Sequence, residues 1–191
     1  MATLTIANTT ITVSDNLKDN LIITEFCLGN AQAKNKIYIY VSPSCLHCGK
    51  FIVEDVEEFV KKSSKDCYVV IKLIPTSAKD IFIMKLIQRE AKNQNDYLTI
   101  FQNYIKRVIA TINHITPTKE QVDLFKGSKN DEEMIKFQVV ALEFGFSNEK
   151  IVAAIPDMNG QMESKIINDY QKTVRYIADI LDTKELDLPF I

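Results

Sequence analysis

The residues of this chain whose types and spacing best suit chemistry are Cys45 and Cys48, which are separated by Leu46 and His47. A cysteine thiolate is the nucleophile of thiol–disulfide exchange, and a second cysteine one helical turn away can attack the mixed disulfide that the first one forms. His47 can add positive charge beside the Cys45 sulfur or donate a hydrogen bond to it. The spacing therefore predicts a redox-active pair in which Cys45 attacks, Cys48 resolves and His47 tunes the potential.

The pattern around this pair predicts a strand before it and a helix after it. A β-type run at 36–41 stops at a Ser-Pro-Ser turn, and apolar residues then recur at helical spacing over about 45–62. A second apolar run, at 67–74, ends before a proline and predicts a strand buried on both faces. Cys45 is thus expected at the first turn of a helix, where unpaired N–H groups and the helix dipole favour an anion such as the thiolate.

The segment 28–34, Leu-Gly-Asn-Ala-Gln-Ala-Lys, precedes the first of these strands. Together with the cysteine motif, it resembles the DsbA-like thiol:disulfide oxidoreductases, a family of the thioredoxin fold. The resemblance implies an α/β protein with a thioredoxin-like βαβ core and an inserted all-helical subdomain. It also implies protein thiols and disulfides as substrates, a redox partner protein, and no cofactor beyond the cysteine pair itself.

The apolar pattern, read with the resemblance, divides the chain into three parts. Residues 1–75 form the N-terminal part of the expected thioredoxin-like domain, 76–160 the helical insertion, and 161–191 a return helix and the start of the cis-proline strand. Within the insertion, apolar spacing and capping residues predict helices around Ile83–Ile87, from Tyr97 to Ile112, from a Thr116–Pro117 cap to Gly127, from Asn130 to Gly145, and from Ser147 to just before Pro156. The return helix is expected at 161–181.

Pro189 is the residue that the resemblance places opposite the cysteines. In the family a cis-proline follows the return helix, and the backbone of the residue before it binds an extended substrate peptide; Leu188 and Pro189 match these two positions. A loop proline ahead of a terminal strand is the alternative, because cis X–Pro bonds are rare overall. The family continues with a hairpin partner and a final helix, whereas this sequence stops at Ile191. We therefore expect a chain truncated after the cis-proline, with the C-terminal hairpin and helix missing.

Charge and hydropathy argue against two classes of partner. The 191 residues carry a net charge of −2 with both signs interspersed, so the sequence indicates no surface for nucleic acid. The apolar runs are too short for a membrane span.

The N-terminus shows neither a basic segment nor a continuous apolar one, so the sequence as written predicts a cytoplasmic protein. The resemblance implies a periplasmic protein instead, if a signal peptide has been removed.

The two cysteines outside the motif, Cys27 and Cys67, are expected to be small buried hydrophobic residues. The alternative is a zinc site that joins the motif to further ligands chosen from Cys27, Cys67, His47 and His114. Such a site would lack the second C-x-x-C or paired histidines that zinc sites of this kind usually have.

Many thioredoxin-fold enzymes hold a buried carboxylate beneath the second cysteine, on the central strand. The strand at 36–41 contains no acid, and Lys72 is the one charge expected near the core. Lys72 either points outward with its stem along apolar surface or forms a buried cation that helps to stabilise a thiolate.

Three functions are compatible with these features. The first is a thiol:disulfide oxidoreductase that exchanges disulfides with protein thiols, as oxidant, reductant or isomerase. The second is a truncated, catalytically weak thioredoxin-like domain that only binds a partner, or a remnant of such a domain. The third is a glutathione-using isomerase or transferase of the same architecture. Cys48 argues against the third, because those relatives usually replace the motif with a serine or a single cysteine.

Overall fold

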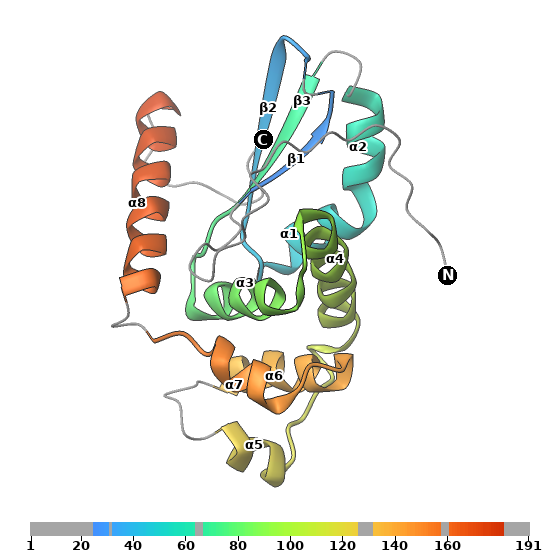
Figure 1. Cartoon of the computed structure of the whole chain (residues 1–191), viewed down its shortest axis with the longest axis vertical. Helices are drawn as coiled ribbons and strands as arrows, with labels where there is room; N and C mark the ends of the chain where they lie inside the picture. The colour runs from blue at the N-terminus through green and yellow to red at the C-terminus, as the bar shows by residue number, and fades with distance from the viewer. Residues whose placement is uncertain (1–24, 31, 64–66, 126–131, 158–160, 182–191) are drawn as a thin grey trace.

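The computed structural model describes residues 25–30, 32–63, 67–125, 132–157 and 161–181 (Figure 1). In this part of the chain three strands form one sheet in the order β1-β3-β2. Their bounds are Glu25–Gly29 for β1, Asn35–Val41 for β2 and Cys67–Leu73 for β3. The central strand β3 is antiparallel to β1 and parallel to β2. The strands predicted at 36–41 and 67–74 are thus confirmed.

β1 is not among the predicted strands. Its two buried apolar residues are Phe26 and Leu28, whereas its first residue, Glu25, is exposed. It ends at Gly29, whose φ of 88° lies in the left-handed region that glycine favours. Buried and less buried residues alternate along β1, but over too few positions to predict a strand. Pairing with β3, rather than local preference, therefore determines that this segment is a strand.

The helix predicted over 45–62 is present and follows β2 directly. It consists of three consecutive segments: α1 (Leu46–Lys50), the π-helical turn η1 (Phe51–Asp55) and α2 (Val56–Ser63). The Gln102 side chain donates to the Ile52 carbonyl at 3.1 Å, inside the π-helical turn. Because β2 precedes this helix in the chain and β3 follows it, the three elements form the predicted βαβ core.

The described part of the insertion contains helices and no strand, as predicted. Its helices are α3 (Ala78–Glu90), α4 (Gln94–Thr111), α5 (Lys119–Phe125), α6 (Glu132–Phe144) and α7 (Asn148–Ala154). Ser147 caps α7, as expected, by accepting from the Lys150 N–H. Gly145 ends α6 with φ 108°, and the Phe146 N–H reaches back to the Ala141 carbonyl at 3.1 Å, which is the C-terminal glycine motif that the sequence predicts.

The start of α5 differs from the prediction. Thr116 and Pro117 lie before the helix, and Thr118 caps it: the Gln121 N–H donates to the Thr118 hydroxyl at 3.3 Å, and the Thr118 N–H donates to the Gln121 side chain at 2.8 Å. This reciprocal capping box satisfies two helix-end donors. The expected pair of Thr116 as cap and Pro117 as first helical residue satisfies only one, which explains the shift.

One hydrophobic core joins the sheet to the helices. Phe26 of β1 contacts Tyr97 and Phe101 of α4, with ring centroids 5.4 and 6.0 Å apart. Ile39 of β2 and Ile71 of β3 lie on the same sheet face and are buried in the same cluster. Since the insertion helices share this cluster with the sheet, they form part of the support for the cysteine helix.

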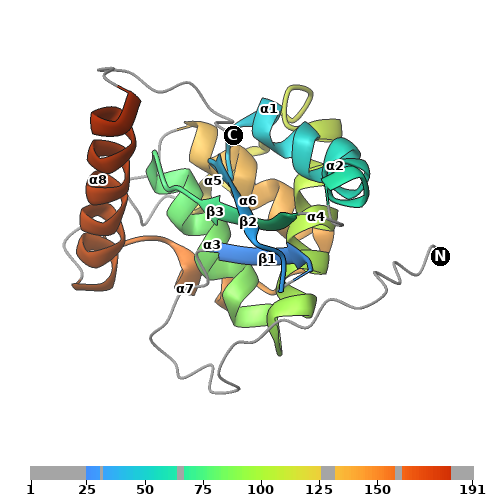
Figure 2. The same cartoon turned by 90° about the horizontal axis from the view of Figure 1, so that it is seen from above.

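The return helix α8 (Gln161–Leu181) has the predicted bounds and lies on the other side of the sheet from α2 and α4, as Figures 1 and 2 show. Ile177 and Tyr170 of α8 pack with Tyr40 and Ile74, in a small cluster separate from the main core. The expected packing of α8 on the sheet is thus confirmed for this part of its apolar face. No helix in the described ranges combines the length and apolarity needed to cross a bilayer.

Candidate functional site

Cys45 and Cys48 lie at the beginning of the helix that follows β2. Cys45 is the N-cap residue of α1, with extended φ and ψ of −76° and 115°, and its sulfur accepts a hydrogen bond from the Cys48 N–H at 3.4 Å. Cys45 is half-buried, whereas Cys48 is only 1% exposed. All four cysteines are free thiols in this structure. The expected geometry, with one accessible sulfur at a helix N-terminus and one shielded sulfur a turn deeper, is present.

The turn before α1 explains why Cys45 occupies this position. The Cys45 N–H donates to the Ser42 carbonyl at 3.2 Å, which closes a tight turn around the buried Pro43 at the end of β2. The Gly49 N–H then donates to the Cys45 carbonyl at 2.8 Å and starts the helix. Cys45 is therefore the residue at which extended backbone becomes helical.

The environment of Cys48 favours the protonated thiol. Burial, followed by a side-chain hydrogen bond with Cys45, raises the pKa of Cys48 to about 12, and the nearby charges of Cys45 and Asp80 act in the same direction. A backbone hydrogen bond with Ser42 lowers it, but by less. Cys48 is thus a poor nucleophile at neutral pH until its proton is removed.

His47 is exposed on the first turn of α1. Among the described residues, the donor to the Cys45 sulfur is the Cys48 N–H, and no hydrogen bond joins His47 to that sulfur. The hydrogen bond expected from His47 is thus not present, and the addition of positive charge near Cys45 stays a prediction.

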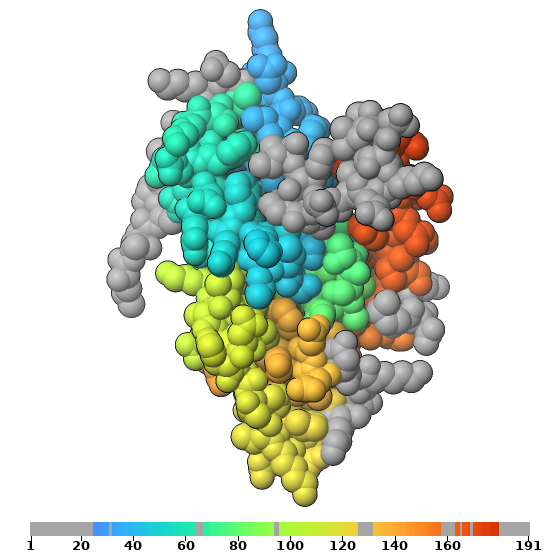
Figure 3. All heavy atoms as spheres, turned by 180° about the vertical axis from the view of Figure 1, so that it is seen from behind, coloured from blue at the N-terminus to red at the C-terminus, as the bar shows by residue number. Residues whose placement is uncertain are grey.

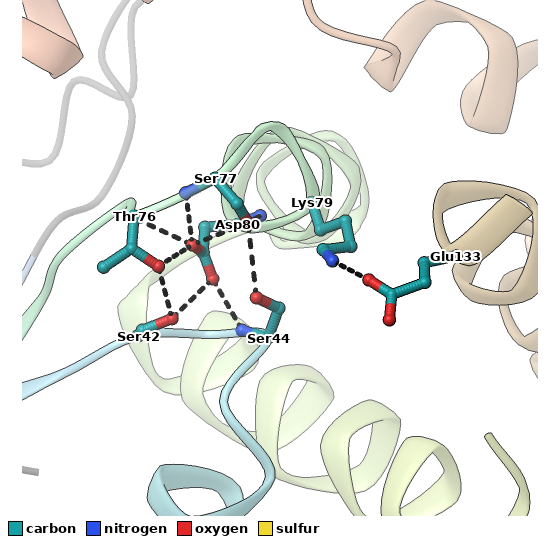
Figure 4. Close-up of polar contacts among 7 residues, drawn as sticks. All are labelled: Ser42, Ser44, Thr76, Ser77, Lys79, Asp80 and Glu133. Atoms are coloured by element: carbon teal, nitrogen blue, oxygen red, sulfur yellow. Dashed lines mark hydrogen bonds and ion pairs between the residues drawn. The ribbon is translucent and has the colours of Figure 1, made fainter. Parts of the chain in front are cut away.

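Asp80 is a residue of this site that the sequence did not reveal, and its carboxylate is 0% exposed. Its Oδ1 accepts from the Ser42 hydroxyl at 2.9 Å and from the Ser44 N–H at 2.6 Å (Figure 4). Its Oδ2 accepts from the N–H groups of Thr76 (2.7 Å) and Ser77 (2.8 Å) and from both of their hydroxyls (3.0 Å each). The expectation that Lys72 is the one charge near the core is therefore wrong.

The available signal for Asp80 was the spacing Ser77-x-x-Asp80 after a proline. This spacing is that of a capping box, and both of its reciprocal bonds are present at the start of α3. A capping acid is usually exposed, so the pattern alone does not indicate that the carboxylate reaches across to the turn from Ser42 to Cys45, here called the cysteine turn.

Lys72 points away from the cysteines, as the first of its two interpretations predicts. Its ammonium lies 3.8 Å from the Glu25 carboxylate and 5.4 Å from the centre of the Tyr38 ring. Its side chain is 35% exposed. The alternative of a buried cation that stabilises the thiolate is wrong, because Lys72 lies on the sheet face opposite the main core.

Cys27 and Cys67 are half-buried rather than buried, which corrects the prediction for both. Cys27 lies on the edge strand β1, and Cys67 is the first residue of β3. Within the described ranges, no three His, Cys, Asp or Glu side chains are grouped closely enough to hold a metal ion. The geometry thus offers no support for the zinc alternative. Leu188 and Pro189 lie outside the described residues.

Gly49, directly after the motif, allows α1 to approach α4 closely. A Cβ atom built on Gly49 would lie 2.7 Å from Ile105 Cγ2 and 3.3 Å from Ile109 Cδ1. The Cγ2 methyl of a β-branched residue cannot swing aside easily. In the space-filling view of Figure 3, the α1–α2 segment (cyan) lies directly above α4 (yellow-green).

We expect Gly49→Ala to destabilise the chain by about 1–3 kcal/mol through overpacking, although alanine is the better helix former. Urea unfolding measures this change. The double variant Gly49→Ala with Ile105→Ala removes the clashing methyl, so the two substitutions should cost less together than the sum of their separate effects. A Gly49→Ala chain as stable as the unsubstituted one would contradict the close contact.

The model of the thioredoxin family matches residues 22–139. Among solved structures, the protein-disulfide isomerase from Novosphingobium aromaticivorans has a TM-score of 0.54 at 14% identity, with 81% of each chain covered. The alpha-DsbA1 of Wolbachia pipientis has a TM-score of 0.53 at 17% identity, covering 81% of this chain and 69% of its own. A single-residue variant of it gives 0.54 at 17%, with 85% and 71% covered. No protein of curated function matches the chain. At these identities the solved structures show a shared fold.

Proposed function

Because the chain belongs to the thioredoxin family, we propose that it is a thiol:disulfide oxidoreductase in which Cys45 is the attacking nucleophile and Cys48 the resolving cysteine. The observation that carries the proposal is the asymmetry of the pair. Cys45 is half-buried at a helix N-cap with an N–H donor aimed at its sulfur, whereas Cys48 is buried behind it. A hydrogen-bond donor and a helix N-terminus both favour the thiolate of Cys45.

In the reducing direction, the Cys45 thiolate attacks one sulfur of a substrate disulfide. A bond forms between Cys45 Sγ and that sulfur, the substrate S–S bond breaks, and the second substrate sulfur leaves and takes up a proton. Cys48 then loses its proton and attacks Cys45 Sγ, which releases the first substrate sulfur as a thiol. The pair becomes a disulfide and the substrate gains two electrons and two protons. In the reverse direction the same residues oxidise a dithiol substrate.

The remaining parts of the proposal concern substrate and environment. The proposed substrates are protein thiols and disulfides. A redox partner protein would also exchange a disulfide with the chain, and the cysteine pair is the redox group. His47 would add positive charge beside the Cys45 sulfur from its exposed position. Leu188 and Pro189 keep their expected role of docking an extended peptide as part of the proposal.

The test is a disulfide-exchange assay with a model peptide that carries either a dithiol or a disulfide, in glutathione buffers. We expect the chain to accelerate exchange in at least one direction. The double variant Cys27→Ala with Cys67→Ala should keep this activity, since neither residue contributes to the pair. A folded chain that accelerates neither direction would overturn the proposal.

A further inference from the structure

Asp80 connects the two turns from which α1 and α3 start. Its Oδ1 bonds to Ser42 and Ser44, on the turn that leads into Cys45, and its Oδ2 bonds to Thr76 and Ser77, at the start of α3 (Figure 4). The bond to Ser42 spans 38 positions of sequence. Because the carboxylate is wholly buried, rotation of the cysteine turn would break these bonds without water to replace them. The turn is therefore held to α3 as well as to its own helix.

The same carboxylate is a charge close to the cysteine pair. Six donors and, within the described ranges, no acceptor face its two oxygens, which is the arrangement that suits a carboxylate rather than a carboxylic acid. The charge of Asp80 also adds a small part to the rise in the pKa of Cys48, after the larger effects of burial and of Cys45.

None of the described cations on the helices around this turn is bonded to Asp80. Lys79, the neighbour of Asp80 on α3, bonds to Glu133 of α6 and points away from the cysteine turn (Figure 4). His47 and Lys50 of α1 are exposed. On α4, Lys106 and Arg107 are exposed too, and Arg107 bonds to Glu143. The negative charge of Asp80 thus has no cation bonded to it among the described residues.

We propose that Asp80 is a positioning residue of the exchange site, which fixes the turn that carries Cys45 and, as a buried negative charge, biases the cysteine pair toward its disulfide. This inference rests on the proposed function. A reduced pair that holds a thiolate has one more negative charge than the disulfide. A fixed anion nearby therefore destabilises the reduced pair and leaves the neutral disulfide almost unaffected.

The test is the equilibrium in which the reduced protein and glutathione disulfide give the Cys45–Cys48 disulfide and two molecules of glutathione. It is measured by acid quenching at a series of glutathione ratios and needs no turnover of a protein substrate. For Asp80→Asn we expect the equilibrium constant for disulfide formation to fall about tenfold at pH 7, which corresponds to a reduction potential about 30 mV less negative. An unchanged or larger constant in a folded Asp80→Asn chain would overturn the proposal.

Two matched variants separate charge from hydrogen bonding and from helix capping. Ser42→Ala removes one bond to the carboxylate but keeps its charge. Asp96→Asn makes the same substitution at the equivalent position of α4, where the Asp96 N–H bonds to the Asn93 cap at 2.9 Å. Both should stay within about twofold of the unsubstituted protein. A shift in Ser42→Ala as large as that in Asp80→Asn would overturn the charge effect.

Asp80→Ser is a second neutral variant, for use if the asparagine amide clashes with the donors of the turn. If neither neutral variant folds, Asp80 is a folding residue and the proposal fails. If the unsubstituted chain forms no Cys45–Cys48 disulfide at any glutathione ratio, the proposed function fails and this inference fails with it. A normal equilibrium in the unsubstituted chain, unshifted by either neutral variant, would overturn this inference alone.

Discussion

Cys45→Ser should abolish disulfide exchange, with a loss of roughly a thousandfold or more, whereas Cys48→Ser should still react once and then stop. The difference follows from the asymmetry of the pair. Without Cys45 no sulfur remains at the α1 N-cap, and Cys48 is both buried and held as a thiol by its raised pKa. Without Cys48 the Cys45 thiolate still forms a mixed disulfide, but no internal thiol releases it.

Mass spectrometry of the quenched reaction measures both outcomes. Cys48→Ser should accumulate a covalent adduct of protein and substrate, which Cys45→Ser should not form. Cys27→Ser and Cys67→Ser are the controls, since both positions are half-buried and lie outside the motif, and each should keep its activity within about twofold. An adduct that accumulates in Cys45→Ser and disappears in Cys48→Ser would reverse the two assigned roles.

Lys85→Met should destabilise the chain by about 3–5 kcal/mol, because it leaves the Glu163 carboxylate buried without its partner. Lys85 of α3 and Glu163 of α8 form an ion pair at 2.5 Å with side chains only 9% and 5% exposed. The Asp157 N–H also donates to Glu163, at 3.3 Å. Among the described side chains, the apolar contacts of α8 with the sheet form a small cluster. We therefore expect this pair to be a main attachment of the helix, and hydrogen exchange in α8 should rise first.

Two comparisons check the effect of Lys85→Met. Lys79→Met removes a more exposed ion pair of the same helix, with Glu133, and should cost less than about 1 kcal/mol. The double variant Lys85→Met with Glu163→Leu replaces both charges with apolar groups and should recover much of the loss. Urea unfolding would contradict the account if Lys85→Met and Lys79→Met were equally stable.

The effect of Lys85→Met should also depend on pH. Burial alone would raise the pKa of Glu163, but the hydrogen bonds from Lys85 and the backbone outweigh it and hold that pKa below its ordinary value. A carboxyl whose pKa is lower in the folded state contributes stability above its unfolded value of about 4.3, and this contribution disappears as the pH falls through the folded value. The difference between the unsubstituted chain and Lys85→Met should therefore shrink below about pH 4.

The parts of the fold that depend on near neighbours in sequence could be predicted. The sequence predicts Cys45 at a helix start because a β-type run stops at Ser42 and helical spacing begins after it, and the structure has that boundary. Ser147 and Gly145 similarly mark the start of α7 and the end of α6, because a capping hydroxyl and a left-handed glycine act within one turn.

The parts that depend on distant segments could not be predicted. Asp80 has the local pattern of an ordinary capping acid, and only the fold brings it to Ser42 and Ser44. Lys85 and Glu163 are 78 positions apart. Lys85 interrupts an apolar run of α3, between Met84 and Leu86, and nothing in that run identifies Glu163 as its partner. In both cases the buried charge is explained by a partner that the sequence pattern does not identify.

The most direct test of the central claim is the order in which the cysteines of the reduced chain react with a limiting amount of iodoacetamide at pH 7. Cys27, Cys45 and Cys67 are all half-buried, so exposure alone predicts similar rates for the three. We expect peptide mapping to find Cys45 modified at least about tenfold faster than Cys27 or Cys67, because the thiolate is the reactive species, and to find Cys48 protected. Modification of Cys27 or Cys67 as fast as that of Cys45, or of Cys48 before Cys45, would contradict it.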